Sequence, residues 1–321
     1  LTNVDYALGS TQKVEKDTVL AVTNASDVYN QYTYKGDLFG SIKLATTNTT
    51  NDSITLSVDE SKTVWESTPF DTQSLGNTLV LWNQLDTTED KILTLDQDVT
   101  LSNADILGTT KGQNVTISGN KTIDLNNQDG FNLLNNNFTI SDATIKGNDT
   151  LITVNNSDVN LINATLNGNI VSNDAYDLNI SGTGTTTLSG TVDNANATLN
   201  NATLVITGDT FANANLNAQS GTLNLQDGNA NVYEFNSLSA NGTNFAIDIS
   251  DTNSDIIKTG AGSNGEILVS TIQFINGNVP SSEFTVQVLQ AQSADIQLEL
   301  DSNLTNVDYA LGSTQKVEKD T

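Results

Sequence analysis

Three segments give the strongest evidence for the fold: FTISDATIKG (residues 138–147), VNLINATLNG (159–168) and LNISGTGTTTLSG (178–190). In each segment apolar residues alternate with Thr, Asn or Ser, which is typical of a strand with one buried and one exposed face. Two segments of the same kind follow, ATLNNATLVITG (197–208) and ANLNAQSGTLNL (214–225). The sequence therefore predicts a series of short, regularly repeated strands.

One apolar position recurs through these segments every ~17–21 residues, which is the length of chain that one coil of a three-sided β-solenoid requires. The residues that recur at this interval are Ile140, Leu161, Ile180, Leu199 and Leu216, and we predict that the first four stack in one inward-facing column. A β-sandwich, the main alternative, would show turn signals every ~8–12 residues without this longer period. The expected fold class is all-β, a parallel β-helix (solenoid) over residues 91–243; the resemblance described below implies that it is right-handed.

Asn, about one residue in seven, is expected at the corners of this solenoid. Sharp corners need positive φ, which Gly adopts freely and Asn tolerates, and Asn side chains on successive rungs can hydrogen-bond to one another in ladders. Upstream, Leu75, Leu79, Trp82 and Leu85 have helical spacing behind a candidate N-cap at Asp71. We expect a short helix over residues 73–90 that covers the first rung of the solenoid.

The text of residues 92–140, which begins ILTLDQDVTLSNADILG, resembles the opening rungs of pectin-lyase-like right-handed β-helices. Residues 244–303 contain FAIDIS, SDIIKTGAGSNGEILVSTIQF, FTVQVLQ and IQLEL, and are similar to the segment that closes the passenger β-helix of bacterial autotransporters. This resemblance implies that a β-sheet cap with a hairpin ends the solenoid. Residues 1–72 contain further alternating strands without the ~20-residue period and are expected to form a β-rich cap or linker.

The last eighteen residues (304–321) repeat the first eighteen (1–18) letter for letter. An identical repeat at this distance predicts tandem units, so that residues 304–321 form the first strand of the next unit and residues 1–72 continue the preceding one. We expect this junction strand to pair with the cap of residues 244–303. Its buried side would carry Val307, Tyr309 and Leu311, which correspond to Val4, Tyr6 and Leu8 in the first copy.

The charge of the chain excludes some partners. The formal net charge is −26, the calculated pI is near 4.1, and all twelve basic residues are Lys. Such a chain is unsuited to binding nucleic acid or an anionic membrane surface. Cys is absent, so there is no disulfide framework, and no apolar run approaches the length of a membrane helix.

Catalysis and metal binding are weaker interpretations. β-Helices can carry polysaccharide lyases and hydrolases, but Arg and His are absent here, and Lys111, Lys121 and Lys146 stand among scattered acids, Asp124, Asp129, Asp142 and Asp158. Residues 124–130 (DLNNQDG) are dense in oxygen ligands, so calcium remains open, although solvated corners look the same. We expect that the chain is not an enzyme and binds no cofactor. Five Asn-x-Ser/Thr triplets in the solenoid are candidate glycosylation sites: Asn137, Asn148, Asn163, Asn179 and Asn196.

These observations favour a structural repeat of an extracellular fibre or adhesin stalk on a prokaryotic cell surface. Its partners would be neighbouring identical repeats, joined head to tail, together with an unidentified host or neighbour-cell ligand. The alternative is a multivalent module that binds a glycan or a protein through many copies.

Overall fold

The described part of the chain is all-β, and most of it forms a parallel β-solenoid of about eight turns in the computed structural model. The structure describes residues 19–23, 28–33, 41–45, 51–57, 76, 79–80, 82–83, 90–95, 97–102, 105–279, 284–302 and 304. The chain divides into two compact units, Leu1–Val159 and Asn160–Thr321. The boundaries predicted at residues 72, 90, 243 and 303 stay predictions.

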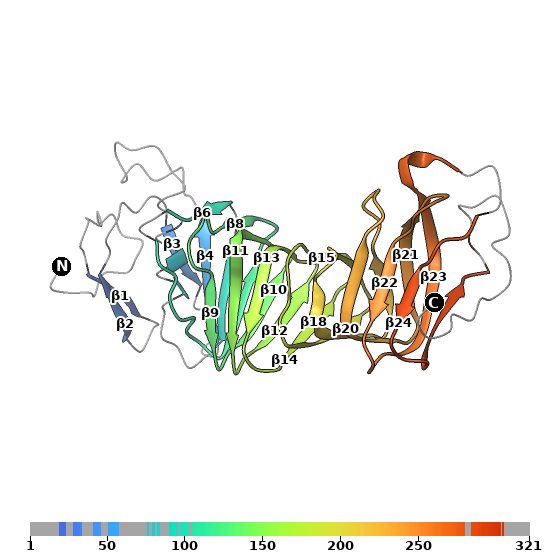
Figure 1. Cartoon of the computed structure of the whole chain (residues 1–321). Helices are drawn as coiled ribbons and strands as arrows, with labels where there is room; N and C mark the ends of the chain where they lie inside the picture. Colours follow the sequence, from blue (N-terminus) through green and yellow to red (C-terminus); the bar gives the residue numbers. More distant parts are fainter. Residues whose placement is uncertain are drawn as a thin grey trace. The chain divides into compact units, whose positions relative to one another are not determined.

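The first unit begins with antiparallel strands and continues as a parallel ladder (Figure 1). Strands β1 and β2 form an antiparallel hairpin, β3 pairs antiparallel with β4, and from β4 onward the pairings are parallel. Strand β7 lies between β5 and β10, and β8 lies between β6 and β11. The strands are β1 (Val19–Thr23), β2 (Val28–Thr33), β3 (Ser41–Ala45), β4 (Asn51–Ser57), β5 (Asp90–Leu95), β6 (Val99–Thr100), β7 (Asn114–Ser118), β8 (Thr122–Asp124), β9 (Phe131–Leu134), β10 (Asn137–Ser141) and β11 (Thr144–Asn155); β12 (Asp158–Ile162) contains the boundary between the units.

The segment before β5 supplies partners for a buried charge. Lys91 is fully buried; its Nζ donates to the carbonyl oxygen of Asn83 (2.9 Å) and lies 4.8 Å from the centroid of the Trp82 ring. Both contacts compensate for removing the ammonium group from water. In the predicted helix of residues 73–90, the described residues, Gly76, Leu79, Val80, Trp82 and Asn83, have helical backbone. The remaining residues of that stretch lie outside the description, so the length of the helix and its capping role stay predictions.

The second unit is a longer parallel ladder, in which odd and even strands alternate in two columns of pairings (Figure 1). Strands β14, β16, β18 and β20 pair in sequence, as do β15, β17, β19 and β21. The strands are β13 (Thr165–Ser172), β14 (Tyr176–Ser181), β15 (Thr185–Leu188), β16 (Ala195–Asn200), β17 (Ala202–Ile206), β18 (Phe211–Ala218), β19 (Gly221–Asn224), β20 (Val232–Ala240), β21 (Thr243–Ile249), β22 (Ile256–Thr259), β23 (Asn264–Phe274), β24 (Leu289–Ala291) and β25 (Ile296–Leu300), with one 3-10 turn, η1 (Ile275–Gly277).

The predicted inward column is largely confirmed. Ile140, Leu161, Ile180 and Leu199 are each fully buried, and Ile180 pairs with Leu199 across β14 and β16. Leu216, which recurs at the same interval, lies outside this column, because Leu199 pairs with Ala218 whereas Leu216 pairs with Ala197. The column passes into small residues at this point, and the larger Leu216, also buried, belongs to the neighbouring inward column.

Corners and amide ladders follow the expected chemistry. Nine of the ten described non-glycine residues with positive φ are Asn, and the tenth is Asp142. On the outer face of the second unit, the Asn215 amide donates to Asn196 Oδ1 (3.1 Å), and the Asn236 amide donates to Asn215 Oδ1 (2.9 Å). Asn therefore serves two structural purposes, turning the chain and linking successive rungs.

After Asn244 the structure differs from the expected terminating sheet. Strand β21 pairs in parallel with β23, β22 with β24, and β23 with β25, so the described strands continue the solenoid ladder to Leu300. The antiparallel contact described here is an isolated bridge between Ile249 and Ser254. The rungs in this part are longer, which removed the ~20-residue period on which the sequence argument depended.

Candidate functional site: an amide-lined groove

The predicted junction strand cannot be placed. Val4, Tyr6, Leu8, Val307, Tyr309 and Leu311 all lie outside the described residues. The described chain next to it consists of β25, a hydrogen bond from the N–H of Asp301 to Val269 O (2.9 Å), and a turn closed by Leu304 N–H on Asp301 O (3.1 Å). Pairing of residues 304–321 with the preceding strands stays a prediction.

The candidate glycosylation residues occupy different environments. Asn137, Asn179 and Asn196 are exposed on strands, and the latter two take part in amide ladders. Asn163 is half-buried at a corner with φ 50°, and its Oδ1 accepts a backbone N–H from the next rung (2.7 Å). Asn148 lies in β11, and its side chain is outside the description. An enzyme acting on the folded chain would reach the three exposed residues most readily; modification stays a prediction.

The suggested calcium loop is a corner of the first unit. Asp124 forms an ion pair with Lys146 on the next rung (3.0 Å), and it also accepts the N–H of Asn126 (3.0 Å). Asn126 and Asn127 both have positive φ, which explains their place in the turn. Within the described residues no group of three or more His, Cys, Asp or Glu side chains is arranged to hold a metal ion. The remaining acids named above, Asp129, Asp142 and Asp158, lie at separate strand ends and corners.

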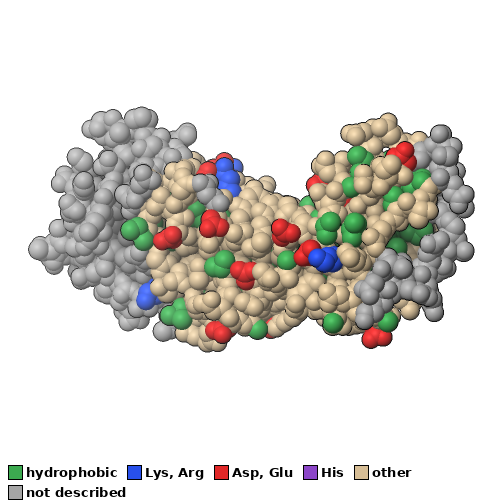
Figure 2. Space-filling model, in the orientation of Figure 1, with side chains coloured by type: hydrophobic (Ala, Val, Ile, Leu, Met, Phe, Trp, Pro, Cys, Tyr) green, Lys and Arg blue, Asp and Glu red, His purple; other side chains and the backbone are tan. Residues whose placement is uncertain are grey.

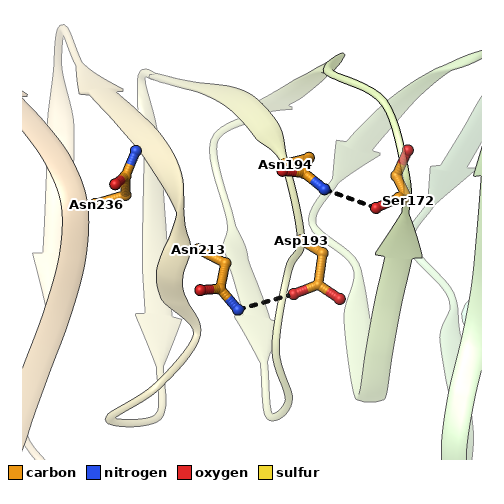
Figure 3. Close-up of a pocket in the computed structure, with 5 residues that line it drawn as sticks. All are labelled: Ser172, Asp193, Asn194, Asn213 and Asn236. Atoms are coloured by element: carbon orange, nitrogen blue, oxygen red, sulfur yellow. Dashed lines mark hydrogen bonds between the residues drawn. The ribbon is translucent and has the colours of Figure 1, made fainter.

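An open groove on the second unit gathers polar side chains from successive rungs. Its volume is about 480 Å³, and it is lined by Ser172, Asp193, Asn194, Asn213 and Asn236 (Figure 3). Ser172 ends β13, Asp193 and Asn194 immediately precede β16, and the other two residues lie in β18 and β20. No aromatic or aliphatic side chain lines it, so the groove suits a polar ligand.

A β-bulge creates this groove. Phe211 pairs with Phe235 and Asn215 with Ser237, so the three intervening residues of β18 stand opposite Asn236 alone. Asn213 is the middle one of the three and is exposed. Extra residues in one strand bend it and redirect a side chain. On one side of the bulge, the rings of Phe211 and Phe235 stack with their centroids 5.9 Å apart, which fixes the register of the two strands there.

The internal hydrogen bonds of the groove use amide nitrogens as donors (Figure 3). Asn194 Nδ2 donates to the carbonyl oxygen of Ser172 (2.8 Å), and Asn213 Nδ2 donates to Asp193 Oδ1 (3.2 Å). A backbone carbonyl and a carboxylate only accept, so these partners fix which end of each amide faces outward. The Oδ1 atoms of Asn194 and Asn213 and Oδ2 of Asp193 make no hydrogen bond with the described residues. The groove is therefore rich in unused acceptors.

A buried hydroxyl lies beside this carboxylate. Tyr176 is 5% exposed, and its hydroxyl oxygen has no hydrogen-bond partner among the described residues. Burial, and then the charge of Asp193, raise the pKa of Tyr176. The hydroxyl therefore stays neutral and offers a donor that the described chain does not use.

Two buried carboxyl groups form a separate polar cluster between β20 and β22. Asp255 accepts the N–H of Asn231 (3.0 Å) and of Asp248 (2.7 Å), while Asp248 Oδ2 accepts the N–H of Asp227 (2.7 Å) and of Gly228 (2.6 Å). Asp248 and Asp255 are both fully buried. Burial raises the pKa of Asp255 to about 7; the two backbone hydrogen bonds oppose this shift, and the nearby carboxylates of Asp248 and Asp227 add to it.

Sequence reasoning missed both the groove and this cluster, because Asn and Asp in turns are ordinary in such a chain. The unusual length of the rungs after Leu225 hinted at the cluster, and nothing in the sequence hinted at the groove. None of the helical residues described belongs to a helix long and apolar enough to cross a membrane. Comparison of the chain with protein-family models, with curated proteins and with solved structures found no match.

Proposed function

We propose that the chain is a structural repeat of an extracellular fibre or adhesin stalk, in which similar units follow one another head to tail. One observation carries this proposal: an eighteen-residue segment occurs twice with identical sequence (1–18 and 304–321), and a parallel β-solenoid lies in the sequence between the two copies. We further propose that the solenoid is a right-handed β-helix of the pectin-lyase or autotransporter-passenger kind, within a tandem-repeat surface protein.

The physics of a solenoid suits this role. Each rung hydrogen-bonds only to its neighbours, so stability adds up along the axis, and a unit can be copied without redesigning a global core. Parallel strands pair at ~4.8 Å per rung, and a pulling force along the axis is shared by several backbone hydrogen bonds in every rung. Cysteine-free, strongly acidic sequence supports solubility outside the cell. Figure 2 shows acidic side chains dispersed over the described part of one face, with few basic ones.

We propose that the role is non-catalytic, and the positions of the candidate acids support this. Among the acids considered for glycoside cleavage, Asp124 is neutralised by Lys146, and the others occupy separate corners rather than one cleft. A glycosidase needs two carboxyl groups about 5–10 Å apart across the scissile bond. Incubation of the purified chain with polysaccharides should release no reducing sugar; release that depends on Asp124 or Asp158 would overturn this part of the proposal.

The fibre proposal is tested by making chains with one, two and three copies of the 303-residue unit. We expect particle length, measured by electron microscopy and small-angle scattering, to grow by a constant increment per copy. Independent beads on a flexible linker would instead give a length that grows as about the square root of copy number. That result would contradict a continuous stalk.

The junction is tested separately by comparing the full chain with a chain ending at Asn303. If residues 304–321 complete the strands that end at Leu300, the shorter chain should melt at lower temperature or associate through a bared strand edge. Light scattering and thermal unfolding measure both effects. Equal melting and no association would remove the junction strand from the proposal while leaving the fibre test untouched.

A further inference from the structure

We propose that the amide-lined groove of the second unit binds a protonated amino sugar within a hydroxyl-rich glycan. The inference goes beyond the stalk role and does not depend on it, since a stalk needs no groove. It rests on the unused acceptors of Asp193, Asn194 and Asn213, which face one open cavity.

The chemistry of the lining selects a donor. The side-chain amides of Asn194 and Asn213 each donate one N–H group to a hydrogen bond within the groove, whereas their oxygens accept none from the described residues. Asp193 adds a negative charge and forms no ion pair with a described Lys. A ligand that matches must donate hydrogen bonds and carry positive charge, which a protonated amine flanked by hydroxyls does.

The spacing of the acceptors suits a chain ligand. The N–H of Asn194 donates to the carbonyl oxygen of Asn213 (3.0 Å), so these residues lie on adjacent rungs, about 4.8 Å apart along the solenoid. Asn236 stands on the rung after that, opposite the bulge. Three rungs thus present amides in a row, and successive sugar units of an extended glycan would meet one amide each.

Other occupants fit the groove less well. An apolar or aromatic ligand would find no apolar lining. A phosphate or carboxylate would face Asp193 in a chain of net charge −26. A metal ion would find one carboxylate here, and the described residues contain no cluster arranged to hold one.

The test uses a tetramer of β-1,4-linked glucosamine as the probe, in weakly acidic, low-salt buffer, with the full chain. Binding is followed by the side-chain amide signals of Asn194 and Asn213 in nuclear magnetic resonance titrations. An exposed polar groove predicts a dissociation constant of about 1 mM, with both signals moving together. No shift at either amide at ten times that concentration overturns the proposal.

Two comparisons separate the contribution of the charge from that of the sugar. The fully N-acetylated tetramer should bind about tenfold more weakly, because it lacks the cation. Methylamine, a cation without hydroxyls, should also bind about tenfold more weakly. If the N-acetylated tetramer binds as tightly as the glucosamine tetramer, the charge is irrelevant and the proposal is overturned. If methylamine binds as tightly, the sugar is irrelevant and the proposal is also overturned.

The matched variants are Asp193→Asn and Asp129→Asn. Asp193→Asn keeps an acceptor for the Asn213 amide and removes the charge, so the fold should survive and affinity should fall about tenfold. Asp129 is exposed at a corner of the first unit, and its replacement removes the same charge away from the groove. Binding that drops equally in both variants would reveal a diffuse effect of net charge and overturn the site.

Discussion

The rungs of β14–β18 and those of β20–β25 belong to one parallel ladder, but they are held together by different means. In the earlier rungs paired residues are 19 apart, as Leu199 and Ala218 are, whereas in the later rungs the interval grows to 31, between Gly265 and Ile296. The short rungs rely on apolar columns inside and amide ladders outside. The described residues between 176 and 218 bury no carboxyl group.

The long rungs carry additional loop backbone, and that backbone needs acceptors. Asp248 and Asp255 supply them from inside, accepting N–H groups from residues 227, 228, 231 and 248. Because burial raises the pKa of Asp255, this region is sensitive to pH, whereas the described short rungs bury no carboxyl group. A solenoid can therefore lengthen its rungs and keep its parallel ladder, provided that buried acceptors satisfy the backbone N–H groups of the extra turns.

The largest effect is expected from charging the core of a short rung. Leu199→Asp places a carboxylate at a fully buried position between Ile180 and Ala218, and should cost about 3–5 kcal/mol in the free energy of unfolding. Asn200→Asp is the matched control, because residue 200 is exposed and its oxygen already accepts a hydrogen bond from Ser220. Urea denaturation measures both. Similar losses in the two variants would mean that the inward column is misassigned.

A corner substitution should have the next largest effect. Gly221 has φ 101°, and an added Cβ would lie 2.2 Å from the carbonyl oxygen of Ala202 on the preceding rung. Gly221→Ala should therefore cost about 2–3 kcal/mol, from backbone strain together with a steric clash. At Gly228, φ is 85° but nothing lies within 4 Å of the added carbon, so Gly228→Ala should cost about 1 kcal/mol. If the second variant were the less stable one, the close approach of rungs at Gly221 would be refuted.

The long rungs should respond to pH through Asp255. Its pKa in the folded chain (about 7) is higher than its ordinary value of 3.8, so the folded state holds this proton more tightly than the unfolded state. The stability that it contributes is complete below about pH 4 and is lost as pH rises to about 7. The expected loss is about 2–4 kcal/mol, because one pKa unit corresponds to about 1.4 kcal/mol.

Asp255→Asn tests this dependence, because an amide does not titrate in this range. The difference in unfolding free energy between the natural chain and the variant should shrink from pH 4 to pH 7. Asp251→Asn, exposed in the same connection, removes the same charge and reports the general effect of net charge. If the difference in unfolding free energy between the natural chain and Asp255→Asn stays constant from pH 4 to pH 7, the folded chain does not hold the Asp255 proton more tightly than the unfolded chain.

The smallest effect is expected from the outer amide ladder. Asn215 links Asn196 to Asn236 and also accepts the Ser237 hydroxyl (2.7 Å). Because these bonds are exposed to water, Asn215→Ala should cost only about 0.5–1 kcal/mol. Asn217→Ala serves as the control, because residue 217 lies two residues further along the same face of β18 and makes no amide-ladder bond with the described residues. Equal melting temperatures for the two variants would mean that the ladder adds nothing.

The sequence predicted the fold where large aliphatic residues mark each rung, and it lost the register where they do not. Ile180 and Leu199 were recognisable because both are bulky and isolated among polar neighbours. The column then continues through Ala218, Ala240 and Gly265, and small residues carry no signal of facing inward. The strands after Asn244 were taken for a cap because their spacing changed, although their pairing did not.

The candidate sites were less predictable. The groove depends on a bulge that places three residues of β18 opposite one residue of β20, and such a difference in rung length is invisible without the partner strand. Asp248 and Asp255 resemble every other turn carboxylate in the chain until pairing encloses them. The junction residues were predicted from repetition alone, and Val307 and Tyr309 lie outside the described structure.

Native-state hydrogen exchange at pH 5 and pH 8 tests the contrast between short and long rungs most directly, once observed rates are corrected for intrinsic exchange. The N–H groups of Asn231 and Asp248, which donate to Asp255, should lose protection at the higher pH. The N–H of Gln219, which donates to Leu199 O (3.0 Å) in a short rung, should keep it. Equal changes at all three positions, or none at any, would contradict the account that buried carboxyl groups hold the long rungs and apolar columns hold the short ones.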